Sequence, residues 1–535
     1  MRKEFVIASI IVVVANIAAI FIYPPFLWSM VVFGPLLVIG YFDFFQPHRG
    51  IRRNFPIVGN FRYIFELIRP EINQYFVESN TDGKPFSREQ RSIVYQRAKG
   101  QLDTLPFGTQ KNVDEIGYEW VNHSFMAKLP VNENLRVVVG GPDCAKPYNA
   151  SILNISAMSY GALSKNAILS LNGGAKDGGF AHNTGEGGLS PFHLEPGGDL
   201  IWQIGTGYFG CRASDGRFSP ERFAENSQVE NVKMIEIKIS QGAKPGHGGI
   251  LPAAKVSKEI AAIRGVPVGQ DVMSPPAHSA FSTPLEFVEF VQTLRKLSGG
   301  KPVGMKFCVG KRREFLAICK AMVETGITPD YVAVDGGEGG TGAAPFEFSN
   351  HVGAPLMESL IFVHNALVGV GVREKVKVIA GGKVTTGFGI IKRIAAGADL
   401  IYSARAMMMA LGCIQALRCN ANVCPAGIAT QDPYLNAGIH VPTKRKRVQR
   451  FHHETVKSAA HILGAMGLDD PSQLRPWHVM RRVGPLEVRH YGEIFEFLEK
   501  GSLLGEHPPK NFERAYKAAT SRSFSAGDTA ATTMV

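Results

Sequence analysis

Short apolar runs alternate with helical stretches from residue 150 onward, and this alternation constrains the fold more than any other feature of the chain. Most runs precede a helical stretch, as with Lys165–Lys176 and Arg312–Thr325, which is the pattern of parallel strands joined by helices. Eight such units close naturally into an α/β fold, a (β/α)8 TIM barrel. The expected strands are Ile152–Met158, Gly179–Asn183, Met234–Ile239, Val268–Val272, Val303–Phe307, Tyr331–Val334, Val376–Ala380 and Leu400–Ser403.

A doubly wound open sheet is the competing architecture. It requires a Gly-x-Gly-x-x-Gly turn after its first strand. The segment that follows the first expected strand, residues 159–164, reads SYGALS and lacks this pattern.

Two uncharged apolar stretches near the amino terminus, Phe5–Ile22 and Phe26–Phe42, predict a tight transmembrane hairpin. As helices they would reach roughly 25–27 Å, close to the roughly 30 Å hydrocarbon core of a bilayer. Basic residues flank both outer ends and place them on the cytoplasmic side; these residues are Arg2, Lys3, Arg49, Arg52 and Arg53. We therefore expect a protein of the inner (cytoplasmic) membrane whose catalytic domain faces the cytoplasm. A cleaved signal peptide, with small residues near Ala15 and Ala18, is the alternative.

The 535 residues exceed what one hydrophobic core usually organises. We expect the hairpin over residues 1–45, a collar region over 46–149 and the barrel over 150–440. A helical extension over 441–517 and a disordered Ser/Thr/Ala-rich tail over 518–535 would follow.

The formal net charge of +12 and pI near 9.3 are compatible with an anionic partner. Nucleic acid is not expected, because aromatic residues are not interleaved with the basic ones in a recognisable binding motif. Anionic lipid, an acidic redox partner, an anionic substrate or a simple solvated surface would each account for the charge.

Three of the seven cysteines, Cys413, Cys419 and Cys424, are bunched beside a Cys-Pro step. The odd number and the bunching argue for a reducing compartment rather than a disulfide framework. Thiolates are soft ligands that suit iron–sulfur centres. Zinc is the alternative, but it usually takes four ligands, often with thiols at two-residue spacing. Three thiolates fit a three-iron cluster better.

Glycine-rich loops follow the expected sixth and seventh strands, and a Ser-Ala-Arg step follows the eighth. Such loops suit a phosphate group. Lys306, in the middle of a strand, suits a flavin ring whose reduced form becomes anionic. The cofactor-binding residues that we expect are Ser159, Lys306, Gly337, Gly381, Gly382, Ser403 and Arg405.

Three cations lie near the end of the strand Met234–Ile239 and of the following helix. Lys238, Lys244 and Arg264 are candidates to bind a substrate carboxylate, since Arg offers a bidentate fork and Lys a movable point charge.

Four motifs, IKISQGAKPGHGGILPAAKV, SPPAH, DGGEGGTGAAP and CIQALRCNANVCPAGIATQ, resemble the FMN-binding synthase domain of glutamate synthase over roughly residues 150–480. The resemblance implies FMN, a [3Fe–4S] cluster held by Cys413, Cys419 and Cys424, and reduction of 2-iminoglutarate to glutamate at the flavin. It also implies that Lys238, Lys244 and Arg264 lie close to the 2-oxoglutarate site.

The chain departs from that family in two respects. We expect no amidotransferase domain, and a membrane hairpin stands in its place. The family's Gly-Glu-Gly-Gly-Gln is Gly246-His247-Gly248-Gly249-Ile250 here, which replaces one carboxylate and one amide beside the substrate position.

The first functional hypothesis is an oxidoreductase that reduces an imine of 2-oxoglutarate or a related keto acid. Ammonia or an amine would supply the nitrogen, and ferredoxin or a reductase subunit would supply the electrons. The second is a membrane-bound electron-transfer subunit that makes no amino acid.

Overall fold

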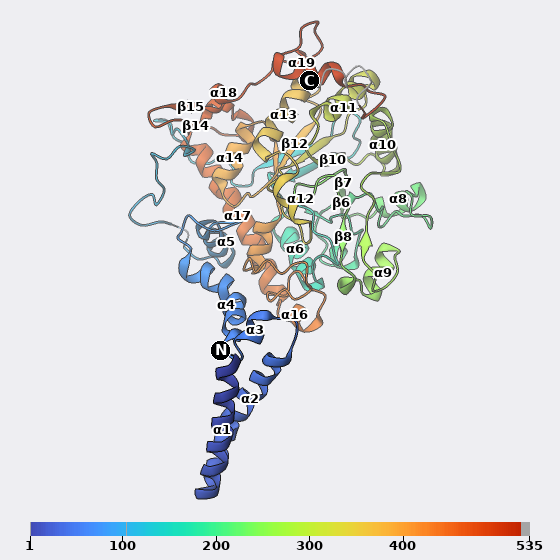
Figure 1. Ribbon diagram of the computed structural model, residues 1–535. Helices are drawn as coiled ribbons and strands as arrows, with labels where there is room; N and C mark the ends of the chain where they lie inside the picture. Colours follow the sequence, from blue (N-terminus) through green and yellow to red (C-terminus); the bar gives the residue numbers. More distant parts are fainter. Residues whose placement is uncertain (1, 103, 526–535) are drawn as a thin grey trace. The chain divides into compact units, whose positions relative to one another are not determined.

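The computed structural model describes residues 2–102 and 104–525 (Figure 1). The chain divides into two compact units, Met1–Arg88 and Glu89–Val535. Residues 46–149, expected as one collar region, are thus shared between the two units.

The first unit is helical. It contains α1 (Arg2–Ile22), η1 (Pro24–Ser29), α2 (Met30–Phe45), α3 (Gly50–Asn54), α4 (Gly59–Ile72) and the π-helical turn η2 (Asn73–Val77). Two spans, Arg2–Ile22 and Pro24–Phe45, are long and apolar enough to cross a membrane, with mean hydropathies of 2.9 and 1.8. A signal sequence can have the same length and apolar composition.

The second unit is organised by a closed barrel of eight parallel strands, which confirms the expected fold. The strands are β4 (Leu153–Ile155), β5 (His182–Asn183), β6 (Leu200–Ile204), β7 (Val232–Lys238), β10 (Val303–Cys308), β11 (Tyr331–Asp335), β12 (Lys377–Gly381) and β13 (Leu400–Ser403).

One of the eight expected strands is wrong. Val268–Val272 is not part of the barrel; only its last residue is extended, in β9 (Val272–Met273), which pairs antiparallel with β8 (Ile250–Leu251). The barrel strand that the sequence reading missed is β6, in which all five residues are buried. Pro267 and Gly269 disfavour a central strand.

Helices surround the barrel (Figure 1). They include α6 (Lys165–Gly178), α7 (Pro191–Leu194), α8 (Pro220–Ser227), α9 (Lys258–Arg264), α10 (Pro284–Leu297), α11 (Arg312–Thr325), α12 (Phe346–His351), α13 (Leu356–Gly369), α14 (Gly387–Ala395) and α15 (Arg405–Leu411). Side-chain caps start several of them: the hydroxyls of Ser164, Thr283 and Thr386 accept backbone N–H bonds. The 25-residue α17 (Val441–Ala465) packs on α6, α14 and α15.

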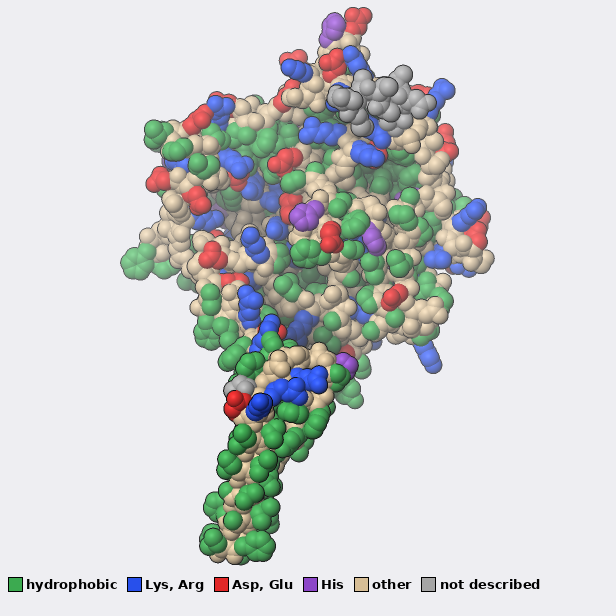
Figure 2. Space-filling view, in the orientation of Figure 1, with side chains coloured by type: hydrophobic (Ala, Val, Ile, Leu, Met, Phe, Trp, Pro, Cys, Tyr) green, Lys and Arg blue, Asp and Glu red, His purple; other side chains and the backbone are tan. Residues whose placement is uncertain are grey.

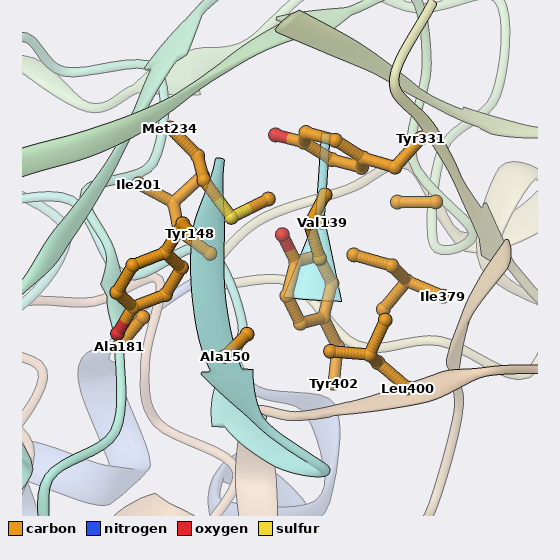
Figure 3. Packing of buried hydrophobic residues seen from close by; sticks show 11 residues of the cluster. Val139, Tyr148, Ala150, Ala181, Ile201, Met234, Tyr331, Ile379, Leu400 and Tyr402 are labelled. Atoms are coloured by element: carbon orange, nitrogen blue, oxygen red, sulfur yellow. The ribbon is translucent and has the colours of Figure 1, made fainter. Parts of the chain in front are cut away.

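A hairpin closes the amino-terminal end of the barrel. Strands β2 (Arg136–Val139) and β3 (Tyr148–Ser151) contribute Val139, Tyr148 and Ala150 to a buried cluster whose other members come mostly from the barrel strands. Figure 3 shows these hairpin side chains beside Met234, Tyr331, Ile379, Leu400 and Tyr402. This end of the barrel is therefore packed, and the opposite end is left for ligands.

The remaining elements include α5 (Arg88–Lys99), α16 (Pro433–Ala437), η3 (Ala253–Lys255), η4 (Pro471–Gln473), η5 (Pro476–His478), α18 (Tyr491–Ile494) and α19 (Lys510–Ala518). A sheet of β1 (Glu119–Val121), β14 (Val479–Arg482) and β15 (Val488–His490) makes the carboxyl-terminal extension less helical than expected.

The disordered tail was expected to begin at 518, which is too early. Ala519 and Ser521 are buried, and the backbone N–H of Leu285 donates to the carbonyl of Ser521 at 3.1 Å. Residues 526–535 of the expected tail lie outside the described residues.

Asp330 directly precedes β11 and is buried. Its carboxylate links segments that meet at the closed end of the barrel. It accepts from Nη2 of Arg295 at 3.0 Å and from the backbone N–H groups of Val303 and Gly141 at 2.8 and 2.7 Å. Asp330→Ala leaves a buried guanidinium without its carboxylate, so we expect it to lower the free energy of unfolding by about 3–5 kcal/mol in denaturant titrations.

The matched control is Glu374→Ala, which removes an exposed ion pair with Lys500 and should cost at most about 1 kcal/mol. Equal losses in the two variants would contradict the structural role of Asp330.

Candidate active site

The barrel interior holds a buried carboxylate, Glu236 of β7. It accepts hydrogen bonds from Nδ2 of Asn183 at 2.7 Å, Nε2 of Gln203 at 2.7 Å and the hydroxyl of Tyr402 at 2.8 Å. Burial raises the pKa of Glu236, and Lys306 opposes that effect. Sequence reasoning did not name this residue, although an acidic side chain inside the apolar run MIEIK was a signal.

Lys306 lies in β10 beside this carboxylate and is only 4% exposed. Its Nζ is 3.2 Å from Oδ2 of Asp335 and 3.3 Å from Oγ of Ser156. The ammonium sits 5.9 Å from the ring centre of Tyr402. Lys306 is therefore held in the barrel interior by partners from two directions, Asp335 of the adjacent β11 and Ser156 next to β4 on the far side of the barrel.

The three cations expected for a carboxylate converge on a residue that the sequence reading did not single out, Glu186. Its Oε1 is 2.6 Å from Nζ of Lys238. Burial raises the pKa of Glu186, but Lys238, Lys244 and Arg264 together outweigh burial and lower it overall. Glu186 follows β5, Lys238 ends β7, Lys244 lies in the next loop and Arg264 ends α9, so the barrel gathers them from four separate segments.

Two of these cations keep donors available for a ligand. Nζ of Lys244 donates to the carbonyl of Ala343 at 2.8 Å, and burial, with help from Lys238, lowers the pKa of Lys244 to about 8. Nη2 of Arg264 donates to the carbonyl of Tyr160 at 3.1 Å. Nε of Arg264 is buried and has no hydrogen-bond partner among the described residues. An unpaired buried N–H is costly, and an anion would satisfy it.

His278 fixes the backbone of Lys238. Burial lowers the pKa of His278 to about 4, so the ring is neutral at pH 7. Its Nε2 lies 2.9 Å from the carbonyl of Lys238 and must donate, which leaves Nδ1 to accept from the hydroxyl of Tyr208 at 3.1 Å. The backbone N–H groups of Ser279 and Ala280 donate to the same hydroxyl.

The loops expected to bind a phosphate follow β11, β12 and β13. We call this region the phosphate corner. Asp335, Gly381 and Tyr402 are paired across these strands, so their loops are neighbours. A Cβ at Gly337 would lie 2.7 Å from the carbonyl oxygen of Gly353, which explains why glycine is needed. Gly382 follows directly.

The two polar side chains expected at this corner already have protein partners. The hydroxyl of Ser403 donates to the carbonyl of Val384 at 3.0 Å, and Nη2 of Arg405 donates to the carbonyl of Glu338 at 2.8 Å. Burial lowers the pKa of Arg405, and the nearby Asp335 and Glu338 oppose this shift. The glycine loops beside the Arg405 cation fit a phosphate, because bare backbone N–H groups and a positive charge can surround an anion.

Ser159 lies elsewhere, in the loop after β4. A Cβ at Gly187 would lie 2.8 Å from Nη2 of Arg264 and 2.9 Å from Cβ of Ser159. Ser159 is thus a neighbour of the cation group around Glu186, not of the phosphate corner.

The cysteine loop follows α15. Cys413, Cys419 and Cys424 are close enough to affect one another electrostatically: burial, together with the other two thiols, raises the pKa of Cys413 to about 11. Within residues 2–102 and 104–525, no three His, Cys, Asp or Glu side chains are placed to hold a single metal ion. A cluster of several irons binds each thiolate through a different iron, so its ligands need not meet at one point.

Lys255 ties the cysteine loop to the barrel. It is 2% exposed, and its Nζ donates to the carbonyls of Ala162, Cys419 and Ala429 at 3.2, 2.7 and 2.9 Å. Three bonds use all three ammonium protons. No local pattern indicates this role, because the partners are backbone carbonyls far along the chain.

The departures from the expected motif lie in the loop after β7. Nδ1 of His247 is 2.9 Å from the carbonyl of Gly248, and its ring packs edge-on against Phe348. Ile250 begins β8 and is half-buried.

A closed parallel barrel whose carboxyl-terminal loops gather cations, glycines and thiols defines a cofactor-binding barrel enzyme. The family described as "Conserved region in glutamate synthase" matches residues 125–469. The chain belongs to the glutamate synthase family. It is accordingly an oxidoreductase that acts on CH–NH2 donors, and the family supports FMN as its cofactor.

Relatives span different shares of the chain. The glutamate synthase large subunit-like protein YerD of Bacillus subtilis (strain 168) is 36% identical over 477 residues, which are 82% of this chain and 90% of that protein. The archaeal glutamate synthase [NADPH] of Methanocaldococcus jannaschii is 37% identical over 323 residues, 60% of each chain. A solved mutant flavocytochrome b2 with pyruvate bound has 12% identity and a TM-score of 0.40, over 78% of this chain and 85% of that chain.

Proposed function

We propose that the protein is a glutamate-synthase-like flavoprotein that reduces an imine formed from 2-oxoglutarate, or a related keto acid, with ammonia or an amine. The observation that carries the proposal is the convergence of Lys238, Lys244 and Arg264 on Glu186. Excess positive charge in a buried site favours an anionic substrate, and one carboxylate among the cations suits a protonated imine.

The chain's own residues divide the work of binding. Arg264, with its unpartnered Nε, and Lys244 would each take a carboxylate group. Glu186 has a lowered pKa and stays ionised at neutral pH. Its negative charge would attract the iminium nitrogen and orient the substrate carbon beside it, an electrostatic arrangement that is fixed before the substrate binds.

FMN would be held at two points. Gly337, Gly381, Gly382, Ser403 and Arg405 would surround its phosphate, and Lys306 would face its ring system. When bound, FMN supplies a hydride and exchanges electrons singly or in pairs. Lys306 stabilises negative charge near it, because its ammonium is buried and fixed by Asp335 and Ser156.

Cys413, Cys419 and Cys424 would hold a [3Fe–4S] cluster as thiolates. Lys255 supports this assignment, since its three hydrogen bonds hold the loop in place beside the barrel. Electrons would come from ferredoxin or a reductase subunit, and the role would be glutamate biosynthesis.

The helices α1 and α2 would anchor the protein in the inner (cytoplasmic) membrane as a hairpin, with the catalytic domain in the cytoplasm. The basic residues that flank both outer ends support this orientation.

An anaerobic titration tests the proposed reaction. The purified full chain, reduced photochemically, should have its flavin reoxidised by 2-oxoglutarate plus ammonia but by neither compound alone. The flavin absorbance near its visible maximum is the readout. Failure of the pair, with reoxidation by a quinone or a protein carrier instead, would favour the electron-transfer subunit and end the synthase proposal.

Substrate affinity should depend on pH through Lys244. Because burial lowers the pKa of Lys244 to about 8, its ammonium is present below that pH and is lost above it. KM for the keto acid should be flat below pH 8 and rise above it, while kcat changes less.

Lys244→Arg keeps its charge over this range and should flatten the KM profile. A wild-type profile flat to pH 9.5, or an identical rise in the variant, would show that another group controls binding.

The cluster and the flavin should be separable. Cys419→Ser should abolish the iron–sulfur absorbance and the electron paramagnetic resonance signal but keep FMN, because the phosphate corner lies on other loops. Cys144→Ser, far along the chain from the cysteine loop, is the control and should keep both. Loss of FMN together with the cluster in Cys419→Ser would show that the two sites are not independent.

A further inference from the structure

The helix α4 presents an apolar stripe that stays exposed among the residues that the structure describes. Phe61, Ile64, Phe65, Ile68 and Ile72 recur at spacings of three and four and therefore lie along one helical face. Their side chains are 38–61% exposed. The stripe continues into η2, where Tyr75 and Phe76 are 54% and 84% exposed. Large apolar side chains exposed in a row indicate an interaction surface.

One residue on the opposite face of α4, Tyr63, is packed. The ring of Tyr63 lies under two guanidinium groups, those of Arg49 and Arg52, at 4.6 and 4.7 Å. Tyr63 is only partly exposed, in contrast to its neighbours along the helix. Glu66, Leu67 and Pro70, which also point away from the stripe, are exposed, so Tyr63 is the packed position that this part of the helix offers for comparison.

The start of α4 is fixed to the end of α2, the second helix of the hairpin. The buried carboxylate of Asp43 accepts from the backbone N–H of Ile57 at 3.1 Å and from Nδ2 of Asn60. A Cβ at Gly40 would collide with Phe5 and approach Ile57. These contacts hold α4 where the apolar hairpin ends.

The charge around this junction is basic. Residues 46–77 contain five arginines and two glutamates. Arg62 and Arg69 flank the stripe on one side, and Arg62 is paired in part with Glu66 at 3.1 Å. Figure 2 shows Lys and Arg side chains next to the hydrophobic surface of the hairpin.

We propose that α4 and η2 form an interfacial helix that lies in the surface of an anionic leaflet. The apolar stripe enters the boundary between headgroups and acyl chains, and the arginines contact lipid phosphates. A lipid surface suits both features together, because basic amphipathic helices bind anionic bilayers through buried apolar area and charge. The inference rests on the membrane anchoring proposed above and adds a second contact to it.

Brominated lipids test the proposal in the full chain reconstituted in phosphatidylcholine/phosphatidylglycerol vesicles. Phe65→Trp places a fluorophore on the stripe, and Tyr63→Trp places one at the packed position on the other side of the same helix. Both are made in a Trp28→Phe background. Lipids brominated near the headgroup should quench the added fluorescence of Phe65→Trp and leave that of Tyr63→Trp intact.

Trp28, in the turn between the two hairpin helices and 79% exposed, reports on the hairpin separately. If brominated lipids quench Trp28 in the parent chain but not Phe65→Trp, anchoring stands and the interfacial helix is wrong. If neither is quenched, the anchoring itself fails.

Two further outcomes would overturn the proposal. A blue shift of Phe65→Trp without quenching, dependent on protein concentration, would assign the stripe to a second copy of the chain. Equal quenching of both variants would remove the distinction between the faces. Hydrogen exchange of residues 59–77 in the unmodified chain gives an independent check: protection should rise when phosphatidylglycerol is added and fall with salt.

Discussion

A carboxylate and an ammonium buried inside a barrel form the interaction on which the site depends. Glu236 and Lys306 would each cost several kcal/mol to desolvate alone. For Glu236, the structure offsets that cost with donors from Asn183, Gln203 and Tyr402. For Lys306, it does so with Asp335 and Ser156. These partners come from five barrel strands or the residues next to them, so the charges hold their positions only when the barrel is closed.

The closed barrel then decides what its open end can bind. Glu186, Lys244 and Arg264 are separated by many residues, and only the carboxyl-terminal edge brings them together around Lys238. His278 fixes the carbonyl of Lys238 through a hydrogen bond, and the hydroxyl of Tyr208 holds His278 in turn. The amino-terminal end of the barrel does not bind ligands in this arrangement, because the hairpin of β2 and β3 fills it with apolar side chains.

Periodicity and motif spacing predicted most of the architecture, since buried strands such as Leu400–Ser403 are short apolar runs bounded by turns. They failed at β6, where LIWQI carries a buried glutamine, and predicted Val268–Val272 instead, a run that contains Gly269 and follows Pro267. The cations of the site were predictable because charges near strand ends stand out. Glu186 and Lys255 were not, because their roles arise from distant partners that no local pattern reveals.

The proposed chemistry requires an anionic substrate to bind among the cations at the open end of the barrel. A crystal structure of the full chain, prepared anaerobically with FMN and 2-oxoglutarate, measures this directly. We predict carboxylate density within hydrogen-bond distance of Nζ of Lys244 and of the guanidinium of Arg264. Ordered 2-oxoglutarate elsewhere, with these cations bound only to protein carbonyls, would contradict the account.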